Sequence, residues 1–173
     1  SSYNVGPLYT AGNFGAGITV GIYELESDTS LASDVSSFEL CYGTATSVST
    51  VHVDGGATQA SSGETPLDVD TIAEMAPAAT IKVYQGPNTG VGSYDTYSAM
   101  VNAASVKVIS VSWGDCEPDL GFAVADGASP EATLFQQAAA EGQTVLASSG
   151  DEGSAACANI PTSPAPSYEH ALE

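Results

Sequence analysis

The sequence predicts an α/β fold built on a parallel sheet with helices on both faces. Five short apolar runs rich in β-branched residues recur along the 173 residues, and segments with helical periodicity lie between them. The runs are continuously apolar rather than alternating, which is typical of strands buried on both faces of a sheet. Strands that alternate with helices form βαβ units, and these units make parallel sheets.

The predicted elements follow one another in regular order. The strand segments are ITVGIYEL from Ile18, VSTVHV from Val48, TIKVYQ from Thr80, VKVISVSW from Val106 and TVLASS from Thr144. The helical segments cover residues 30–40, 67–75, 94–104 and 131–141. Since we find no internal repeat and no linker, we predict that residues 1–173 belong to one domain.

The last part of the sequence differs in composition. From Cys157 onward, the segment CANIPTSPAPSYEHALE carries three prolines among small polar residues. This composition is typical of loops, and we predict an exposed processing loop over roughly residues 158–173. A sheet followed by such a loop, with no helix after its last strand, indicates a fold that is incomplete within these residues.

The charge balance is strongly acidic. Asp and Glu number 21 against Lys82 and Lys107, which gives a formal net charge of −19 at pH 7. Such like charge repels itself in a compact fold, and protonation of carboxylates in acid relieves the repulsion. The composition favours a protein that works at low pH, with salt adaptation as the alternative. The lack of basic patches argues against nucleic-acid binding.

Several other classes of protein are also disfavoured. No stretch approaches the roughly 18 apolar residues of a membrane span. Ser1 does not open a basic segment followed by a long apolar one, so we expect no signal peptide, as in a processed chain. The spacing of the three cysteines shows no metal-binding pattern, and both histidines lie far from them.

Polar residues gather where the predicted strands end. In an open parallel sheet, functional groups lie at the carboxyl ends of the strands. The first strand ends in Glu24 and Glu26, the fourth in SWGD at 112–115, and the fifth in SSGD at 148–151. We therefore expect a site along this edge of the sheet.

A pair of acids opens the helix at 64–70. Glu64 and Asp68 are four residues apart, so their carboxylates share one face of a helix. Acids in a first turn commonly do no more than offset the positive end of the helix dipole. The alternative is a coupled dyad, in which proximity raises one pKa and allows a carboxyl group to exchange protons. The spacing alone leaves both interpretations open.

In combination, these motifs resemble the sedolisin family of serine-carboxyl peptidases. The resemblance is carried by GPLYTAGNFGAGITVGIYELE, VDGG, GETPLDVDTIAEMAPAATIKVYQGPN, VISVSWGDCEP and GQTVLASSGDEGSAAC, in that order up to about Cys157. It implies a subtilisin-like, three-layer α/β fold. The present residues would form the N-terminal portion of the mature catalytic domain.

The resemblance implies roles for individual residues. Glu64 matches the catalytic glutamate, Asp68 the aspartate that supports it, and Asp151 the aspartate that helps to form the oxyanion hole. Glu24 and Trp113 fall where some members have residues that contact the catalytic carboxylates. The family's nucleophilic serine and its calcium site lie beyond the matched segments, so we expect neither in these residues.

The expected chemistry suits acid. A histidine base would be protonated at low pH, whereas a glutamate tuned by a neighbouring aspartate can still accept the proton of a serine. A protonated Asp151 could donate a hydrogen bond to the oxyanion. Activity is therefore expected to fall as rising pH ionises Asp151.

The resemblance also implies partners and a location. A disulfide between Cys116 and Cys157 would resemble pairings in some members and suits a secreted, extracellular protein, with Cys41 left over. The expected partners are protein or peptide substrates and a C-terminal chain of the same precursor, carrying the serine and calcium. The 173 residues alone are expected to be inactive. A non-catalytic binding or inhibitory module is the alternative.

Overall fold

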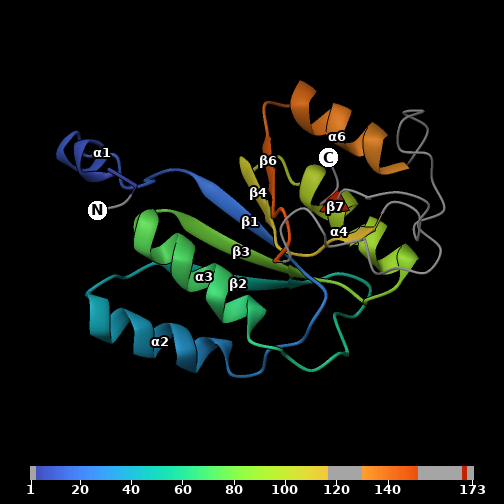
Figure 1. Cartoon of the computed structure of the whole chain (residues 1–173), viewed down its shortest axis with the longest axis horizontal. Helices are drawn as coiled ribbons and strands as arrows, with labels where there is room; N and C mark the ends of the chain where they lie inside the picture. Colours follow the sequence, from blue (N-terminus) through green and yellow to red (C-terminus); the bar gives the residue numbers. More distant parts are fainter. Residues whose placement is uncertain (1–2, 117–129, 152–168, 171–173) are drawn as a thin grey trace.

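The computed structural model is a parallel sheet between two layers of helices, and it describes residues 3–116, 130–151 and 169–170 (Figure 1). Five parallel strands lie in the order β2-β3-β1-β4-β6. Their bounds are β1 Thr19–Glu24, β2 Ser47–His52, β3 Thr80–Gln85, β4 Val108–Val111 and β6 Thr144–Ala147. The predicted parallel α/β fold is confirmed.

Four main helices connect these strands, with bounds α2 Leu31–Tyr42, α3 Glu64–Met75, α4 Gly90–Val101 and α6 Pro130–Ala140. Helix α4 begins four residues before the predicted start, because the Thr89 side chain accepts a hydrogen bond from the Gly92 amide and caps the helix there. Helix α3 begins at Glu64, so both acids of the predicted pair lie on it.

Three short elements were not predicted, since they are too short to show a periodic pattern. They are α1 (Gly6–Thr10), β5 (Asp115–Cys116) and β7 (Glu169–His170). Strands β5 and β7 pair antiparallel. Most of the predicted processing loop at 158–173 lies outside the described residues. In the part of the chain that is described, no helix is long and apolar enough to cross a membrane.

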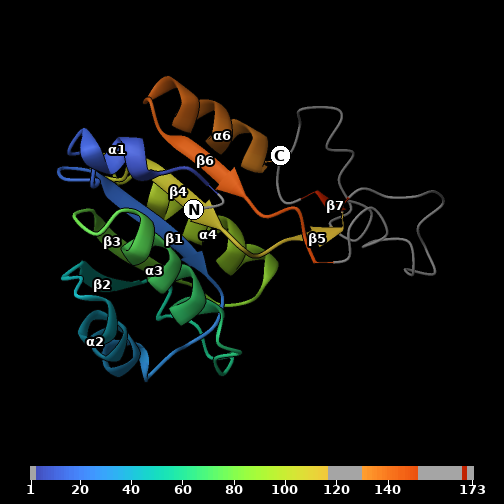
Figure 2. The same cartoon turned by 60° about the vertical axis from the view of Figure 1, so that its left-hand side comes forward.

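The helices cover the sheet on both faces (Figures 1 and 2). Helices α2 and α3 pack on one face, and α4 and α6 pack on the other. Fully buried aliphatic side chains fill both interfaces, and each is worth roughly 1.5–3 kcal/mol relative to exposure. Gly21 admits α4, because a Cβ there would lie 2.9 Å from Met100 Cε.

Alternation along β1 decides which side chains reach the functional edge. Ile22 packs in the cluster with α2 and α3, while Tyr23 and Leu25 pack in the cluster with α4 and α6. Since successive side chains of a strand point to opposite faces, Glu24 shares the face of Ile22. Glu26, two residues further, also reaches toward α3. The central strand thus places two carboxyl groups, those of Glu24 and Glu26, on the α3 side of the sheet.

Candidate active site

The candidate site lies at the carboxyl end of β1, in the middle of the sheet. The chain places β2 and β3 on one side of β1, and then β4 and β6 on the other. The site therefore coincides with the topological switch point, where ligands bind in open α/β sheets. Helix α3 starts above this point with Glu64 and continues to Asp68 one turn later.

Asp68 is held by the strand next to β1. Ile109 and Val111 of β4 point to the α6 side, which leaves Ser112 on the side of α3. The Ser112 hydroxyl lies 2.9 Å from both carboxylate oxygens of Asp68. Burial raises the pKa of Asp68 to about 6; the Ser112 hydrogen bond opposes this rise, and the charge of Glu64 adds to it.

Glu24 and Trp113, both expected near the catalytic carboxylates, contact each other. Trp113 Nε1 donates a hydrogen bond of 2.9 Å to Glu24 Oε2. Burial raises the pKa of Glu24 to about 8. The Trp113 hydrogen bond opposes the rise, whereas the charges of Asp68, Glu26 and Glu64 add to it. Four acidic side chains therefore interact electrostatically in one small region.

One oxygen of Glu24 lacks a partner among the described residues. Glu24 Oε1 is buried without a hydrogen bond, and so is Nε2 of Gln85, the residue beside Glu24 in the β1–β3 register. An unpaired oxygen disfavours the charged form of the carboxyl group, because a buried charge needs hydrogen bonds. The arrangement is consistent with a Glu24 that stays protonated.

Glu26 differs from Glu24 although both follow the same strand. Its side chain is fully buried, and its carboxylate accepts hydrogen bonds from Ser61, Ser62, Glu64 and Thr65. Burial acts to raise the pKa of Glu26, but the hydrogen bonds from Ser62, Thr65 and Ser61 outweigh it and lower the pKa. In moderate acid, Glu26 is ionised while Glu24 and Asp68 keep their protons. Neighbouring carboxyl groups with pKa values pushed apart are the arrangement that acid–base chemistry requires.

These pKa shifts predict how stability depends on pH. Both Glu24 and Asp68 have raised pKa values in the folded protein, so the folded form binds their protons more tightly than the unfolded form. The resulting stabilisation is complete below about pH 4 and is lost as pH rises through about 6 and about 8. In the full-length protein, Glu24→Gln should remove the larger part of this dependence.

We expect wild type to lose roughly 3 to 5 kcal/mol of unfolding free energy relative to Glu24→Gln between about pH 4 and about pH 9. Urea unfolding monitored across this range measures the difference. Glu74→Gln, which replaces an exposed carboxylate on α3, is the matched control and should run parallel to wild type. Parallel curves for Glu24→Gln and wild type would show that Glu24 has no raised pKa.

Asp151 lies apart from this cluster. It follows β6 and is exposed, and β4 separates β6 from β1 in the sheet. None of the hydrogen bonds described for the cluster reaches it. Its position at the carboxyl edge of the sheet agrees with the sequence expectation, but its predicted role remains a prediction.

The structure thus brings together four of the five predicted acid and tryptophan positions: Glu24, Glu64, Asp68 and Trp113. Two further residues contribute, which the sequence indicates only as strand-end residues without a role. Ser112 binds Asp68, and Glu26 binds the start of α3. The alternation of side chains along a strand is the signal that could have indicated both residues. Glu26 follows Glu24 by two positions, so the two share one face, and Ser112 follows β4 on the α3 side of the sheet.

The cysteine prediction is only partly covered by the described residues. Cys41 is free and exposed on α2. Cys116 lies in β5, and Cys157 falls outside the described residues, so their pairing remains a prediction. Within the described ranges, no three His, Cys, Asp or Glu side chains are grouped so that they could hold a metal ion.

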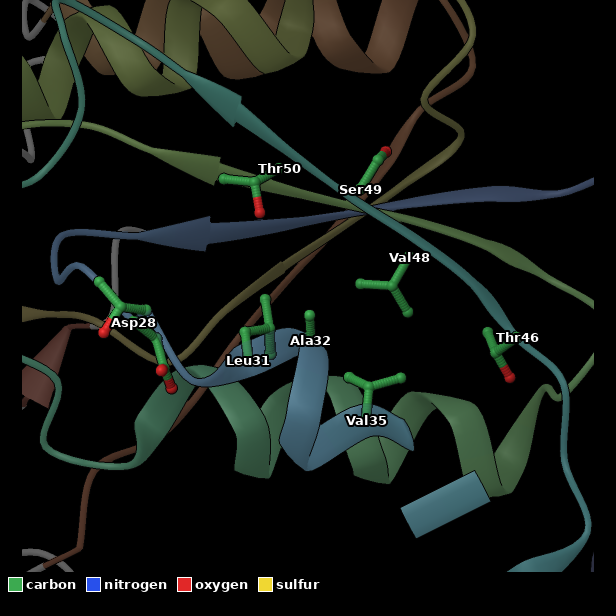
Figure 3. Close-up of a pocket in the computed structure, with 9 residues that line it drawn as sticks. Asp28, Leu31, Ala32, Val35, Thr46, Val48, Ser49 and Thr50 are labelled. Atoms are coloured by element: carbon green, nitrogen blue, oxygen red, sulfur yellow. The ribbon is translucent and has the colours of Figure 1, made fainter. Parts of the chain in front are cut away.

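A pocket of about 360 Å³ lies elsewhere, between α2 and the edge strand β2 (Figure 3). Leu31, Ala32 and Val35 of α2 face Val48 of β2 across it, and Asp28 lies at one end. None of the predicted site residues lines it. The carboxyl cluster, rather than this pocket, is therefore the candidate for chemistry.

Comparison with known proteins finds similar peptidases. The chain is 36% identical over 151 residues to kumamolisin of Bacillus sp. (strain MN-32), covering 81% of this chain. It is 34% identical over 157 residues to sedolisin of Pseudomonas sp. (strain 101), covering 83% of this chain. It is 33% identical over 165 residues to xanthomonalisin of Xanthomonas sp. (strain T-22), covering 86% of this chain. No family model matches.

A solved structure agrees with these relatives. The fold matches that of Pseudomonas sedolisin, a serine-carboxyl proteinase complexed with two molecules of pseudo-iodotyrostatin, with a TM-score of 0.71 and 30% identity. The match covers 87% of this chain and 44% of that one. The chain spans 26%, 26% and 19% of the lengths of the three curated relatives. The likeness therefore concerns only part of each relative.

Proposed function

Because the chain belongs to the sedolisin family of serine-carboxyl peptidases, we propose that the full-length protein is a secreted, acid-acting serine-carboxyl endopeptidase. It hydrolyses peptide bonds of proteins or peptides through a set of serine, glutamate and aspartate. The observation that carries the proposal is the linked carboxyl cluster at the carboxyl end of β1. Two of its acids have pKa values raised to about 6 and about 8.

Glu64 acts as the general base in this proposal. It lies half-buried in the first turn of α3, at the edge of the carboxyl cluster. Asp68, one turn later, keeps its proton in acid and so adds no second negative charge beside Glu64. Below the pKa of a histidine, a carboxylate is the side-chain base still available to take a proton from a serine.

The supporting contacts hold Asp68 and Glu24 in place. Ser112 fixes Asp68 through both carboxylate oxygens, and Trp113 fixes Glu24 beside it. Each of these contacts joins one element to another, so the orientation is set by tertiary packing. Positioned groups of this kind lower the barrier, because little reorganisation is needed during the reaction.

The remaining parts of the machinery are proposed to come from outside these 173 residues. The nucleophilic serine and a calcium ion are assigned to a C-terminal segment, on the same polypeptide or on a second chain cut from one precursor. Asp151 is assigned to the oxyanion hole, where its protonated carboxyl group would donate to the developing negative charge. Within this assignment, residues 1–173 alone have no peptidase activity.

A cleavage assay with the full-length protein tests the proposal. A peptide library should be cut at internal bonds at about pH 4, with activity declining toward neutral pH as Asp68 ionises. Pseudo-iodotyrostatin, which the solved sedolisin carries, should inhibit the cleavage. A protein that binds peptides at this pH without cutting any of them would instead be a binding or inhibitory module.

A further inference from the structure

We propose that Glu26 is a positioning residue of this site, whose buried carboxylate caps α3 from the central strand and thereby fixes the backbone of Glu64. The proposal rests on the proposed function for its catalytic consequence. The capping contact itself stands on the hydrogen bonds and burial described above.

The backbone amides without a helical partner at the start of α3 support this role. The first amides of a helix have no partner within the helix and need acceptors from elsewhere. The N-cap residue here is Gly63, which has no side chain to accept them and adopts φ of 101°. Leu67 N already bonds to Gly63 O, and Pro66 has no N–H. The amides of Glu64 and Thr65 therefore remain to be satisfied.

Glu26 satisfies both of these amides. Glu64 N and Thr65 N donate to Glu26 Oε1 at 3.2 and 3.3 Å. Ser62 N donates to the other oxygen at 2.5 Å, so the preceding loop is held as well. A carboxylate 38 residues away in sequence thus does what a Ser or Asp at the N-cap usually does.

Side-chain contacts extend the same attachment. The Ser61 hydroxyl lies 3.0 Å from Glu26 Oε1 and 3.2 Å from Asp28 Oδ2, and it accepts a hydrogen bond from Gly63 N. Glu26 is 0% exposed, so these donors replace the water that would otherwise solvate its charge. The loop before α3, the start of α3 and the end of β1 are therefore joined through one carboxylate.

The charges around Glu26 show why its ionised form is maintained. The acidic groups nearby are Asp28, which shares Ser61, and Glu24, Glu64 and Asp68 of the cluster. Glu24 and Asp68 keep their protons in moderate acid, and the repulsion from the acids that are ionised is offset by three backbone amides and by the positive end of the helix dipole. The lowered pKa of Glu26 agrees with this balance.

The test uses Glu26→Gln in the full-length protein. The Gln amide group would present N–H donors to amides that also donate, so part of the cap is lost. Hydrogen exchange of the amides at 62–65 should become about 10-fold faster or more. Turnover should fall by about 10-fold to 100-fold with KM nearly unchanged, since the displaced Glu64 acts in the chemical step.

A spectroscopic signal adds a readout that a purely structural role would not move. Trp113 binds Glu24, so its emission, taken as the difference from a Trp113→Phe variant, follows the ionisation of Glu24. The charge of Glu26 contributes to the raised pKa of Glu24. Removing that charge should therefore shift this titration toward lower pH.

Glu39→Gln is the matched control. Glu39 Oε1 also accepts a backbone amide, from Thr46 at 2.6 Å, but it lies on α2 away from the site. This variant should leave the exchange at 62–65, the turnover and the Trp113 titration unchanged. Ser61→Ala removes one donor from the exposed loop, so it should fold and show a smaller change in the same direction.

The outcomes distinguish the capping role of Glu26 from its consequence for catalysis. Unchanged exchange at 62–65 in Glu26→Gln would overturn the cap. Faster exchange with unchanged turnover and an unchanged Trp113 titration would overturn the positioning role. A wild-type protein without peptidase activity would refute the proposed function and the catalytic part of this inference, while the exchange rates would still decide whether Glu26 caps α3.

Discussion

Replacing Glu64 by Gln is expected to reduce turnover of the full-length protein by about 100-fold to 10,000-fold, the range for loss of a general base. Gln keeps the length and shape of the side chain but cannot accept the proton of a serine. The backbone amide of residue 64 still donates to Glu26, so the start of α3 should be preserved. Steady-state kinetics at about pH 4 measure the loss.

Two comparisons make this experiment specific. Glu74→Gln replaces an exposed carboxylate near the other end of the same helix and should retain wild-type turnover. The near-UV circular dichroism of Glu64→Gln should match that of wild type. A Glu64→Gln protein with most of its turnover intact would identify Glu64 as a charge that only offsets the helix dipole.

Replacing Asp151 by Ala is expected to cost roughly 3 to 4 kcal/mol of transition-state stabilisation, the scale for losing one oxyanion donor. Asp151→Asn keeps a donor at this position and should lose less. Substrate binding should change far less than turnover, since the contact forms mainly in the transition state.

Pre-steady-state acylation rates of wild type, Asp151→Ala and Asp151→Asn across pH measure these differences. Ser149→Ala, on the same exposed segment after β6, controls for a general disturbance of the loop. Small and equal effects of both Asp151 substitutions on acylation would leave Asp151 as a turn residue and remove it from the proposed machinery.

The strands could be predicted from the sequence because each is a short run rich in β-branched and apolar residues. Only the central strand β1 is buried almost throughout, whereas the edge strands β2 and β6 are largely exposed. The pairing of site residues could not be predicted from local pattern. Trp113 and Glu24 meet across 89 positions, and Ser112 and Asp68 meet across 44. Only the order of strands in the sheet brings them together, and local periodicity does not encode that order.

The role of Glu26 could not be predicted from local sequence either. Sequence rules for a helix start look for a capping side chain next to the first turn, and here they find Gly63. The capping side chain instead follows β1, which is distant in sequence. Which residue caps the helix therefore depends on the face of β1 that meets α3. The Glu64 and Asp68 pair can be predicted from the sequence, because helical spacing is local and the surrounding motifs resemble a family.

The sheet order also has a kinetic consequence. β1 pairs only with β3 and β4, and not with β2, which follows it in the sequence. The chain must therefore close long loops before its central strand gains either neighbour, and loops of this kind slow folding. Until then, the acids of the cluster stay in water as independent carboxylates. We expect refolding to be rate-limited by the docking of β1, and to be slower at neutral pH, where Glu24 must take up a proton as it becomes buried.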